Sequence, residues 1–233
     1  LPKLRFVRSS SAAMPGAVMV GIEALFGVPL IEAYGMTEGA HQIASNPLPP
    51  GERRPGSVGP ARGVEVAIVD TASCELPAEG VGEVVIRGQS VTSGYERMAR
   101  ELFTLPGGWL RTGDQGFLGP DGYLFLTGRL KEMVNRGGEK IAPREVENAL
   151  LAHPAVAEAV AFAVAHPSLG EEVGAAVVLA GGQSATPAEI RTFAARRLAA
   201  FKVPRKLVVI DTIPLGPTGK PLRVGMAERL GLD

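Results

Sequence analysis

The N-terminal part of the chain alternates apolar runs of strand length with one of helix length. Residues 4–10 (LRFVRSS) are typical of a buried strand, and residues 28–35 (VPLIEAYG) predict a second strand. Between them, residues 17–27 have helical spacing and end at a glycine. A strand, a helix and a strand within about 30 residues predict a βαβ unit with parallel strands. Ligands bind at the carboxyl ends of such strands, where this chain has SSSAA and YGMTEGAH.

Short apolar runs separated by Gly and Pro turns fill the middle of the chain, from residue 56 to residue 128. The runs are VEVAIVD (64–70), GEVVIRG (82–88) and GYLFLTG (122–128). Short strands broken by turn-forming residues predict an antiparallel, barrel-like β subdomain. Together with the βαβ unit, this subdomain predicts that residues 1–130 are a fragment of a larger α/β domain.

The pattern changes again after the segment GRLKEMVNRGGEKIAP, which ends at Pro143. Proline suits the first position of a helix, and amphipathic segments then alternate with strand-like ones. We expect helices at 144–153, 186–200 and 221–230, and strands at 155–166, 171–180 and 205–211. The sequence therefore predicts a small α+β domain over residues 131–233, with its boundary between Leu130 and Lys131.

Charge and composition argue against several classes of function. The 24 Lys and Arg residues balance 24 Asp and Glu residues, so no net charge favours nucleic acid or an anionic membrane. The longest apolar runs are far shorter than the roughly 18 residues that span a bilayer, and no signal peptide is recognisable. Cys74 is the single cysteine, which excludes an internal disulfide and fits a reducing compartment. We therefore expect a cytoplasmic protein that acts on small molecules.

Two short motifs carry side chains suited to nucleotide binding. In YGMTEG (34–39), a hydroxyl could bind a phosphate oxygen and a carboxylate could bind a divalent ion. In WLRTGDQG (109–116), Asp114 on a tight glycine-containing turn could accept hydrogen bonds from both hydroxyls of a ribose. A plain strand-to-loop turn and a solvated turn aspartate are the alternatives, and the residues alone leave both open.

Two further segments combine basic residues with glycines. The segment GRLKEMVNRGGEKIAPREVE (128–147) combines basic residues with a Gly-Gly pair that allows close backbone approach to a ligand. In PLGPTGKPLR (214–223), Lys220 stands between a glycine and a proline, a pattern that predicts an ordered loop with the lysine at its tip. A charged surface linker and a surface turn with a solvated lysine are the alternatives.

These motifs, taken in order, resemble the adenylate-forming superfamily of acyl-CoA synthetases, peptide-synthetase adenylation domains and luciferases. YGMTE, GEVVIRG, TGD, GRLKE with GGEKIAPREVE, and PTGK together cover nearly the whole chain. The resemblance implies an acid–thiol ligase that uses ATP and Mg²⁺ to activate a carboxylate as acyl-AMP and then transfers it to coenzyme A. Lys220 would be the catalytic lysine that steadies negative charge in the transition state.

The resemblance also implies roles for the other motif residues. Tyr34 would stack on adenine, Thr37 would bind phosphate, and Glu38 would hold the Mg²⁺. Asp114 would bind the ribose hydroxyls with help from Arg129. These assignments make Thr37 and Glu38 candidate catalytic residues beside Lys220.

A third group of residues is assigned to domain rotation. Lys131 corresponds to the hinge at which the family's C-terminal domain rotates between the two half-reactions. Gly137 and Gly138 correspond to the loop that lines the tunnel for the pantetheine arm of coenzyme A. Residues 131–233 would then be the mobile C-terminal domain, and residues 1–130 the C-terminal part of the large adenylation domain.

Two features depart from the family pattern. The family's Ser/Thr/Gly-rich phosphate loop does not occur in the sequence, and typical members are considerably longer, so we interpret the chain as a truncated member. Leu215 also replaces a secondary lysine. The partner expected from the first departure is the missing N-terminal portion, or a second copy of the chain, because the incomplete sheet would expose apolar surface.

Within the superfamily, RSSSAAM and the segment from Glu32 to Gly59 look most like the oxalate–CoA ligase branch. Ser11 and His41 would supply polar anchors for the second carboxylate of a small diacid. A loop histidine without a ligand is the alternative for His41. Two other functions stay open: a medium-chain or aryl acyl-CoA ligase, and a non-catalytic nucleotide-binding fragment that lacks the phosphate loop.

Overall fold

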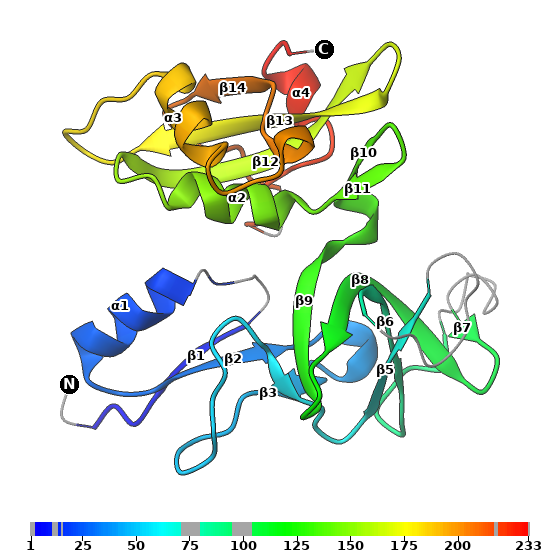
Figure 1. The fold of residues 1–233 in the computed structure, drawn as a ribbon. Helices are drawn as coiled ribbons and strands as arrows, with labels where there is room; N and C mark the ends of the chain where they lie inside the picture. The colour runs from blue at the N-terminus through cyan, green and yellow to red at the C-terminus, as the bar shows by residue number, and fades with distance from the viewer. Residues whose placement is uncertain are drawn as a thin grey trace. The chain divides into compact units, whose positions relative to one another are not determined.

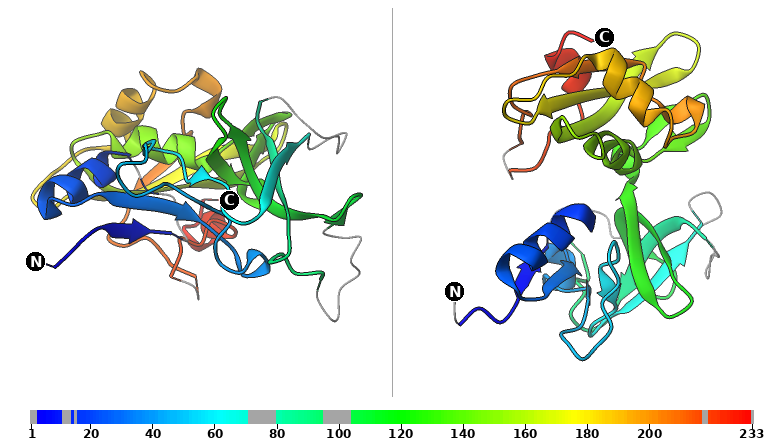
Figure 2. Two further views of the ribbon diagram at one scale, coloured as in Figure 1. Left: turned by 90° about the horizontal axis from the view of Figure 1, so that it is seen from below. Right: turned by 60° about the vertical axis from the view of Figure 1, so that its left-hand side comes forward.

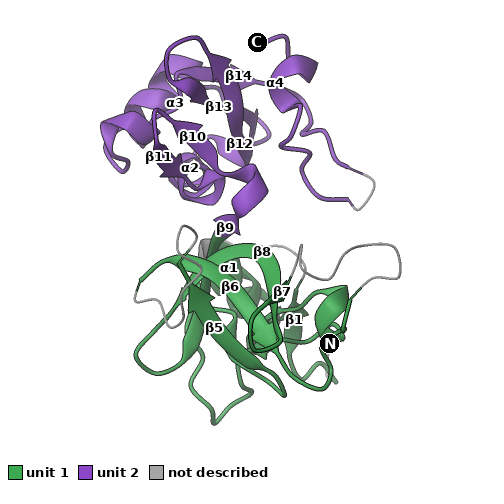
Figure 3. Ribbon diagram, turned by 90° about the vertical axis from the view of Figure 1, so that its right-hand side faces the viewer, with its two compact units in different colours: residues 1–127 green, residues 128–233 purple. Residues whose placement is uncertain are grey.

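The computed structural model divides into two compact units, Leu1–Thr127 and Gly128–Asp233, which are coloured separately in Figure 3. The structure describes residues 3–10, 14, 16–70, 80–94, 104–216 and 219–232. Within the described part of the chain, no helix has both the length and the apolar character that a membrane span requires.

The first unit begins with the predicted βαβ arrangement (Figure 1). Strand β1 (Val7–Ser9) is followed by helix α1 (Gly16–Phe26) and strand β2 (Leu30–Tyr34). The strands pair in parallel, and all five residues of β2 are buried. A short third strand, β3 (Ala44–Ser45), runs antiparallel to β2. The carboxyl end of β2 therefore carries Tyr34 and the loop that follows it.

A second, antiparallel sheet completes the first unit, as the short strands predict. Its order is β4-β9-β8-β6-β5, with β7 paired to β8. The strands are β4 (Gly59–Pro60), β5 (Glu65–Val69), β6 (Gly82–Arg87), β7 (Thr104–Leu105), β8 (Trp109–Leu118) and β9 (Tyr123–Arg129). Leu110 and Leu124 from this sheet share one buried core with Tyr34 and Ile43. The two sheets of the unit are thus packed around common apolar side chains.

The second unit is a mixed sheet with helices on both faces. Its strand order is β11-β10-β13-β12, with β14 parallel to β13. The elements are β10 (Val134–Arg136), β11 (Glu139–Ile141), α2 (Pro143–Leu151), β12 (Val156–His166), β13 (Gly170–Leu179), α3 (Pro187–Ala194), β14 (Lys206–Val209) and α4 (Met226–Arg229). Two 3₁₀ turns, η3 (Leu130–Glu132) and η4 (Ala200–Lys202), complete it. The α/β and α+β fold class expected from the sequence is confirmed.

Alternation along β12 explains the two layers of helices. Phe162 lies in a buried cluster with Met226 of α4, whereas the adjacent Ala161 lies in a second cluster with Val146 of α2 and Ile190 of α3. Successive side chains of a strand point to opposite faces of the sheet. Helices α2 and α3 therefore cover one face and α4 covers the other (Figures 1 and 2).

Helix starts in the second unit follow local sequence signals, with one exception, but the predicted helix at 186–200 is too long, because α3 ends at Ala194. Pro143 opens α2, and α3 starts with a capping box between Thr186 and Glu189. The predicted helix at 221–230 is wrong in its extent, because α4 spans only Met226–Arg229. Gly225 adopts a left-handed conformation (φ 75°), and the segment before it is committed to the loop around Lys220, so the helix begins after this glycine.

Candidate active site

Two of the predicted nucleotide-binding residues meet in the interior of the first unit. The Tyr34 hydroxyl, at the end of β2, donates a 2.6 Å hydrogen bond to Oδ2 of Asp114 in β8, 80 residues further along the chain. Both side chains are buried. Hydrogen bonds from hydroxyls to carboxylates are short and strong because the acceptor is charged. The pair fixes the Asp114 carboxylate beside the carboxyl end of a parallel strand.

A bulge in β8 directs the Asp114 side chain. The sequence predicts a tight turn here, and that expectation is wrong, because residues 109–118 form one continuous strand. Gly113 has φ +72°, and the β6–β8 register shifts beside it. The Thr112 hydroxyl donates to Val84 O at 2.7 Å and accepts from the Asp114 amide at 3.1 Å. Bulges re-aim side chains without ending a strand, and only glycine takes this φ easily.

A buried carboxylate from the neighbouring strand holds the bulge. Glu83 of β6 has a side chain that is 3% exposed. Its Oε1 accepts a hydrogen bond from the Gly113 amide at 3.1 Å, and its Oε2 accepts one from Nε of Arg111 at 2.9 Å. Nη2 of Arg111 also forms an ion pair with Oε2 at 2.7 Å. Glu83 lies in the predicted motif GEVVIRG, but the sequence alone does not predict this role for it. An acidic residue at a strand end is usually solvated, and its partners stand 28 and 30 residues away.

The loop after Tyr34 carries the predicted phosphate and metal residues. A 3₁₀ turn, η1 (Thr37–Gly39), follows β2, and the next two residues have positive φ: Ala40 at 50° and His41 at 72°. Thr37 and His41 are exposed, and Glu38 is half-buried. The Thr92 amide donates to Glu38 O at 2.8 Å. Non-glycine residues with positive φ cluster at functional sites, because their strain persists only where the surroundings enforce it.

The donor set of this loop suits Mg²⁺ only together with a nucleotide. Among the residues that the structure describes, no cluster of three or more His, Cys, Asp or Glu side chains could hold a metal by itself. Mg²⁺ usually keeps several waters and is bound by one or two carboxylates plus substrate phosphates. Glu38 meets the protein's part of that requirement. Ser11, the predicted partner of His41, lies outside the described residues, as does Cys74.

The second unit presents Lys220 on a closed turn. The Gly216 amide donates to Lys220 O at 2.8 Å, and the Gly219 amide donates to Gly216 O at 2.9 Å. Leu215 and Pro221 form an isolated antiparallel bridge across the base of the turn. Lys220 is exposed. Backbone contacts of Leu215, Gly216, Gly219 and Pro221 therefore hold the described part of the loop around the exposed Lys220. Pro217 and Thr218 of the predicted loop lie outside the described residues.

An ion-pair network joins the segment after Lys220 to the predicted hinge. Arg223 Nε and Nη2 donate to the two carboxylate oxygens of Glu147 at 3.0 Å each, and its Nη1 donates to Glu132 Oε2 at 3.0 Å. Glu132 follows Lys131 in η3, while Glu147 lies in α2 and also accepts the Ala161 amide at 3.0 Å. Sequence reasoning missed this network, because its members are 76 and 91 residues apart.

The Glu147 carboxyl makes a testable contribution to stability. Burial raises its pKa above the ordinary value of 4.5, and this effect exceeds the opposing pull of Arg223 and the Ala161 amide. A raised pKa in the folded state gives stability below the ordinary value that is lost as pH rises through the folded value. The unfolding free energy of the wild type should therefore fall relative to that of Glu147→Gln as pH rises above 4.5.

Denaturant unfolding of both proteins at several pH values measures this difference. Glu145→Gln is the matched control, because Glu145 is 46% exposed in a pair with Lys202. A difference between wild type and Glu147→Gln that stays constant across the pH range would contradict a raised pKa.

The two predicted coenzyme A glycines form the tip of the β10–β11 hairpin. Arg136 pairs with Glu139, so Gly137 and Gly138 are the two central residues of the turn. Their φ values are +59° and +96°. Two-residue hairpins favour turns in which both central residues have positive φ, which explains the Gly-Gly pair.

The remaining predicted residues divide between the units. Tyr34, Thr37, Glu38, His41 and Asp114 belong to the first unit, and Arg129, Lys131, Gly137, Gly138 and Lys220 belong to the second. Arg129 ends β9, and Lys131 lies in η3; both side chains are exposed. Within the first unit the structure brings Tyr34 and Asp114 together and places the other three residues on one loop.

Comparison with known proteins identifies the family. Residues 1–96 match the model for the AMP-binding enzyme and residues 145–220 match the model for the AMP-binding enzyme C-terminal domain. The chain therefore belongs to the AMP-binding enzymes, the adenylate-forming superfamily that the motifs predict.

Individual relatives refine this placement. The chain is 47% identical over 230 residues to an oxalate–CoA ligase of Saccharomyces cerevisiae. The aligned region covers 97% of this chain and 42% of the relative. It is 43% identical over 224 residues to a sulfoacetate–CoA ligase of Cupriavidus necator, with 95% and 44% covered. The structure matches ATP-bound MatB from Rhodopseudomonas palustris with a TM-score of 0.89 and 32% identity, over 97% of this chain and 45% of that one. The predicted resemblance to oxalate–CoA ligases is confirmed, and the chain spans less than half the length of these relatives.

Proposed function

We propose that this chain is the C-terminal part of an AMP-forming acyl-CoA synthetase. The complete enzyme would join a carboxylate to ATP, giving acyl-AMP and pyrophosphate, and the thiol of coenzyme A would then displace AMP to give a thioester. The buried Tyr34–Asp114 hydrogen bond carries the proposal, because it sets a carboxylate suited to a ribose at the carboxyl end of a parallel strand. Family membership makes that ribose part of ATP.

The first unit would bind the nucleotide. Asp114 accepts the ribose hydroxyls, and the ring of Tyr34 stacks on adenine while its hydroxyl holds Asp114. Thr37 donates to a phosphate oxygen from the exposed loop, and Glu38 supplies the carboxylate for Mg²⁺. Bound Mg²⁺ would neutralise phosphate charge as pyrophosphate leaves.

The second unit would serve the two half-reactions in turn. Lys220 places a positive charge beside the α-phosphate and the attacking carboxylate during adenylation. Arg129 assists at the ribose, and Lys131 is the hinge about which residues 131–233 rotate. After rotation the hairpin of Gly137 and Gly138 lines the path of the pantetheine arm. The Arg223 network supports this division, since it ties the turn that contains the hinge to the Lys220 loop.

The acyl substrate that we propose is oxalate or another small acid with a second anionic group. His41 stands on the exposed loop after β2, where its side chain could bind a carboxylate. Ser11, which the sequence predicts as its partner, lies outside the described residues. The names of two relatives, an oxalate–CoA ligase and a sulfoacetate–CoA ligase, both specify small acids with two anionic groups. A medium-chain or aryl acid is the runner-up.

The missing upstream portion is the partner that we propose. The sequence has no Ser/Thr/Gly-rich phosphate loop, so the chain needs that loop from elsewhere to hold the β- and γ-phosphates. Helix α1 leaves Val20 and Leu25 61% and 77% exposed, as expected of a surface that further chain covers. Self-association through the same surface is the alternative, and we assign the complete enzyme to the cytoplasm.

Pyrophosphate release tests the proposal directly. The full-length protein should release pyrophosphate from ATP and Mg²⁺ when oxalate is present, and form oxalyl-CoA when coenzyme A is added. Octanoate and benzoate serve as the medium-chain and aryl comparisons. The chain alone should bind AMP without releasing pyrophosphate. A full-length protein that turns over none of these acids would refute the proposed function and favour a non-catalytic nucleotide-binding protein.

A further inference from the structure

The glycine hairpin is fixed to the turn that joins β12 to β13. The Gly137 amide donates to Leu169 O at 2.9 Å, and Arg136 pairs with Gly170 at the start of β13. A Cβ atom on Gly137 would lie 3.2 Å from Leu169 Cδ2, tighter than ordinary van der Waals contact. The position of the hairpin tip within the second unit is therefore fixed by a segment more than 30 residues away in the chain.

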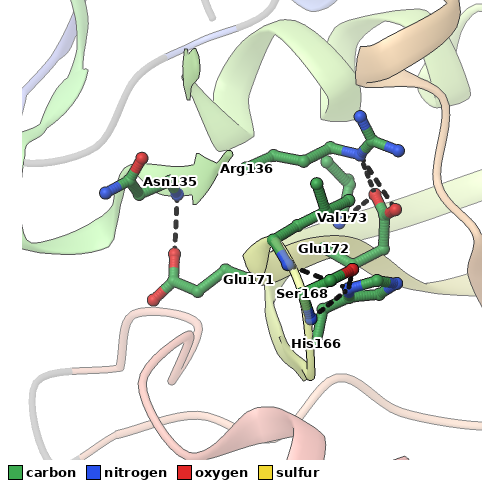
Figure 4. Close-up of polar contacts among 8 residues, drawn as sticks. Asn135, Arg136, His166, Ser168, Glu171, Glu172 and Val173 are labelled. Carbon is green, nitrogen blue, oxygen red and sulfur yellow. Dashed lines mark hydrogen bonds and ion pairs between the residues drawn. The ribbon is translucent and has the colours of Figure 1, made fainter. Parts of the chain in front are cut away.

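His166 stabilises the β12–β13 turn that contacts the hairpin. Its Nδ1 accepts the Ser168 amide at 3.3 Å and the Leu169 amide at 3.2 Å, as Figure 4 shows for Ser168. Both hydrogen bonds close the turn whose Leu169 carbonyl receives Gly137. His166 therefore shapes the surface that the hairpin contacts.

An ion pair between the half-buried Arg136 and the buried Glu172 holds the hairpin to β13. Arg136 Nε donates to both carboxylate oxygens of Glu172 at 2.9 Å (Figure 4). Glu172 is 6% exposed and also accepts the Val173 amide at 2.8 Å. Next to it, Glu171 accepts the Asn135 amide at 2.6 Å, and Asn135 Oδ1 accepts the Gly138 amide at 3.2 Å.

Stability alone is a weak reason for such a pair. Replacing a buried ion pair by apolar residues is often neutral or stabilising, so a pair of this kind is better suited to fixing one geometry. Arg136 immediately precedes Gly137, and the bifurcated hydrogen bond from its Nε to both Glu172 oxygens restricts the position of this residue along β13. Two neighbouring contacts act on the same hairpin: Leu169 O accepts the Gly137 amide, and Glu171 accepts the Asn135 amide.

We propose that Glu172 is a positioning residue for the thioester half-reaction. Its carboxylate holds Arg136 and thereby sets the position of Gly137 and Gly138, the hairpin tip that would line the pantetheine path. This inference rests on the proposed function. Because the hairpin tip takes no part in adenylation under that function, loss of Glu172 should impair one half-reaction and spare the other.

The first test is Glu172→Gln in the full-length protein. Transfer of the acyl group from preformed acyl-AMP to coenzyme A should slow by about 10- to 100-fold, the scale expected when a reacting group is misplaced by about 1 Å. The rate of pyrophosphate release should stay near that of the wild type. Glu145→Gln, which breaks the exposed pair with Lys202 in the same unit, should leave both rates unchanged.

Amide hydrogen exchange separates this inference from the proposed function. In the chain itself, Glu172→Gln should speed exchange at the Gly137 amide while α2 and α3 stay protected. Unchanged exchange at Gly137 would overturn the positioning role whatever the activity. A wild-type protein without acyl-CoA formation would instead overturn the proposed function, a result obtained before any variant is made.

A double variant controls for the cost of an unpaired buried charge. Arg136→Met with Glu172→Met removes both charges, so the fold should regain stability relative to Glu172→Gln while thioester formation stays slow. Recovery of both stability and thioester formation in the double variant would overturn the proposal, as would equal losses in the two half-reactions of Glu172→Gln.

Discussion

Replacement of Lys220 by alanine in the full-length protein should slow acyl-adenylate formation by roughly 10²- to 10³-fold, the usual effect of removing one preorganised group that stabilises transition-state charge. Thioester formation from preformed acyl-AMP should stay close to the wild-type rate. The lysine is exposed at the tip of a hydrogen-bonded turn, so its removal should not disturb the fold.

The different effects expected on adenylation and on thioester formation follow from the position of Lys220 in the chain. It lies beyond the proposed hinge at Lys131, in the unit that would rotate between half-reactions. Negative charge builds on the α-phosphate and the attacking carboxylate only during adenylation. A compact ammonium on a flexible stem can reach that charge and then leave with its domain.

Pre-steady-state measurements of pyrophosphate release and of acyl transfer time the two half-reactions separately. Lys202→Ala is the matched control, because it removes a lysine of the same unit that pairs with Glu145. Wild-type adenylation in Lys220→Ala would show that Lys220 is only a surface lysine. An equal slowing of acyl transfer would show that it does not leave the site.

Local patterns predict much of this fold. Apolar runs locate β2, β6, β12 and β13, and the proline before REVENALLAH locates the start of α2. Each of these signals acts within a few residues, through strand periodicity or helix capping. The last helix is shorter than predicted because local backbone hydrogen bonds close the loop around Lys220, and the helix begins only after Gly225.

The candidate site could be predicted only in part. Motif resemblance points to Tyr34 and Asp114, but their hydrogen bond joins residues 80 apart, and no local pattern encodes it. Glu83, Arg223 and Glu172 have no signal of their own, because a charged residue in a strand or loop is ordinarily solvated. Their roles become visible only when long-range packing brings each of them beside a charged partner.

Removal of the Asp114 carboxylate should have an effect comparable to the loss of Lys220, but on nucleotide binding. In Asp114→Ala the KM for ATP should rise by roughly 10²-fold or more, because each hydrogen bond to a charged group is worth about 1.5–3 kcal/mol and the ribose has two hydroxyls to lose. Tyr34→Phe keeps the aromatic ring and removes only the hydroxyl that donates to Asp114. Its KM should rise less, by about tenfold or about 1.4 kcal/mol, because both hydrogen bonds from Asp114 to the ribose remain and only the hydroxyl that orients the carboxylate is lost.

The buried pair makes a structural control necessary. Asp114→Ala leaves the Tyr34 hydroxyl buried without this partner, at a cost of about 1–3 kcal/mol of stability, whereas the double variant with Tyr34→Phe removes both groups. Asp121→Ala removes an aspartate of the same unit that pairs with Arg54, and it should leave the KM for ATP unchanged. Thermal unfolding and ATP titration of all four variants separate folding from binding. If Asp114→Ala keeps a wild-type KM, or if the double variant restores it, then Asp114 serves only to hold Tyr34 and the nucleotide lies elsewhere.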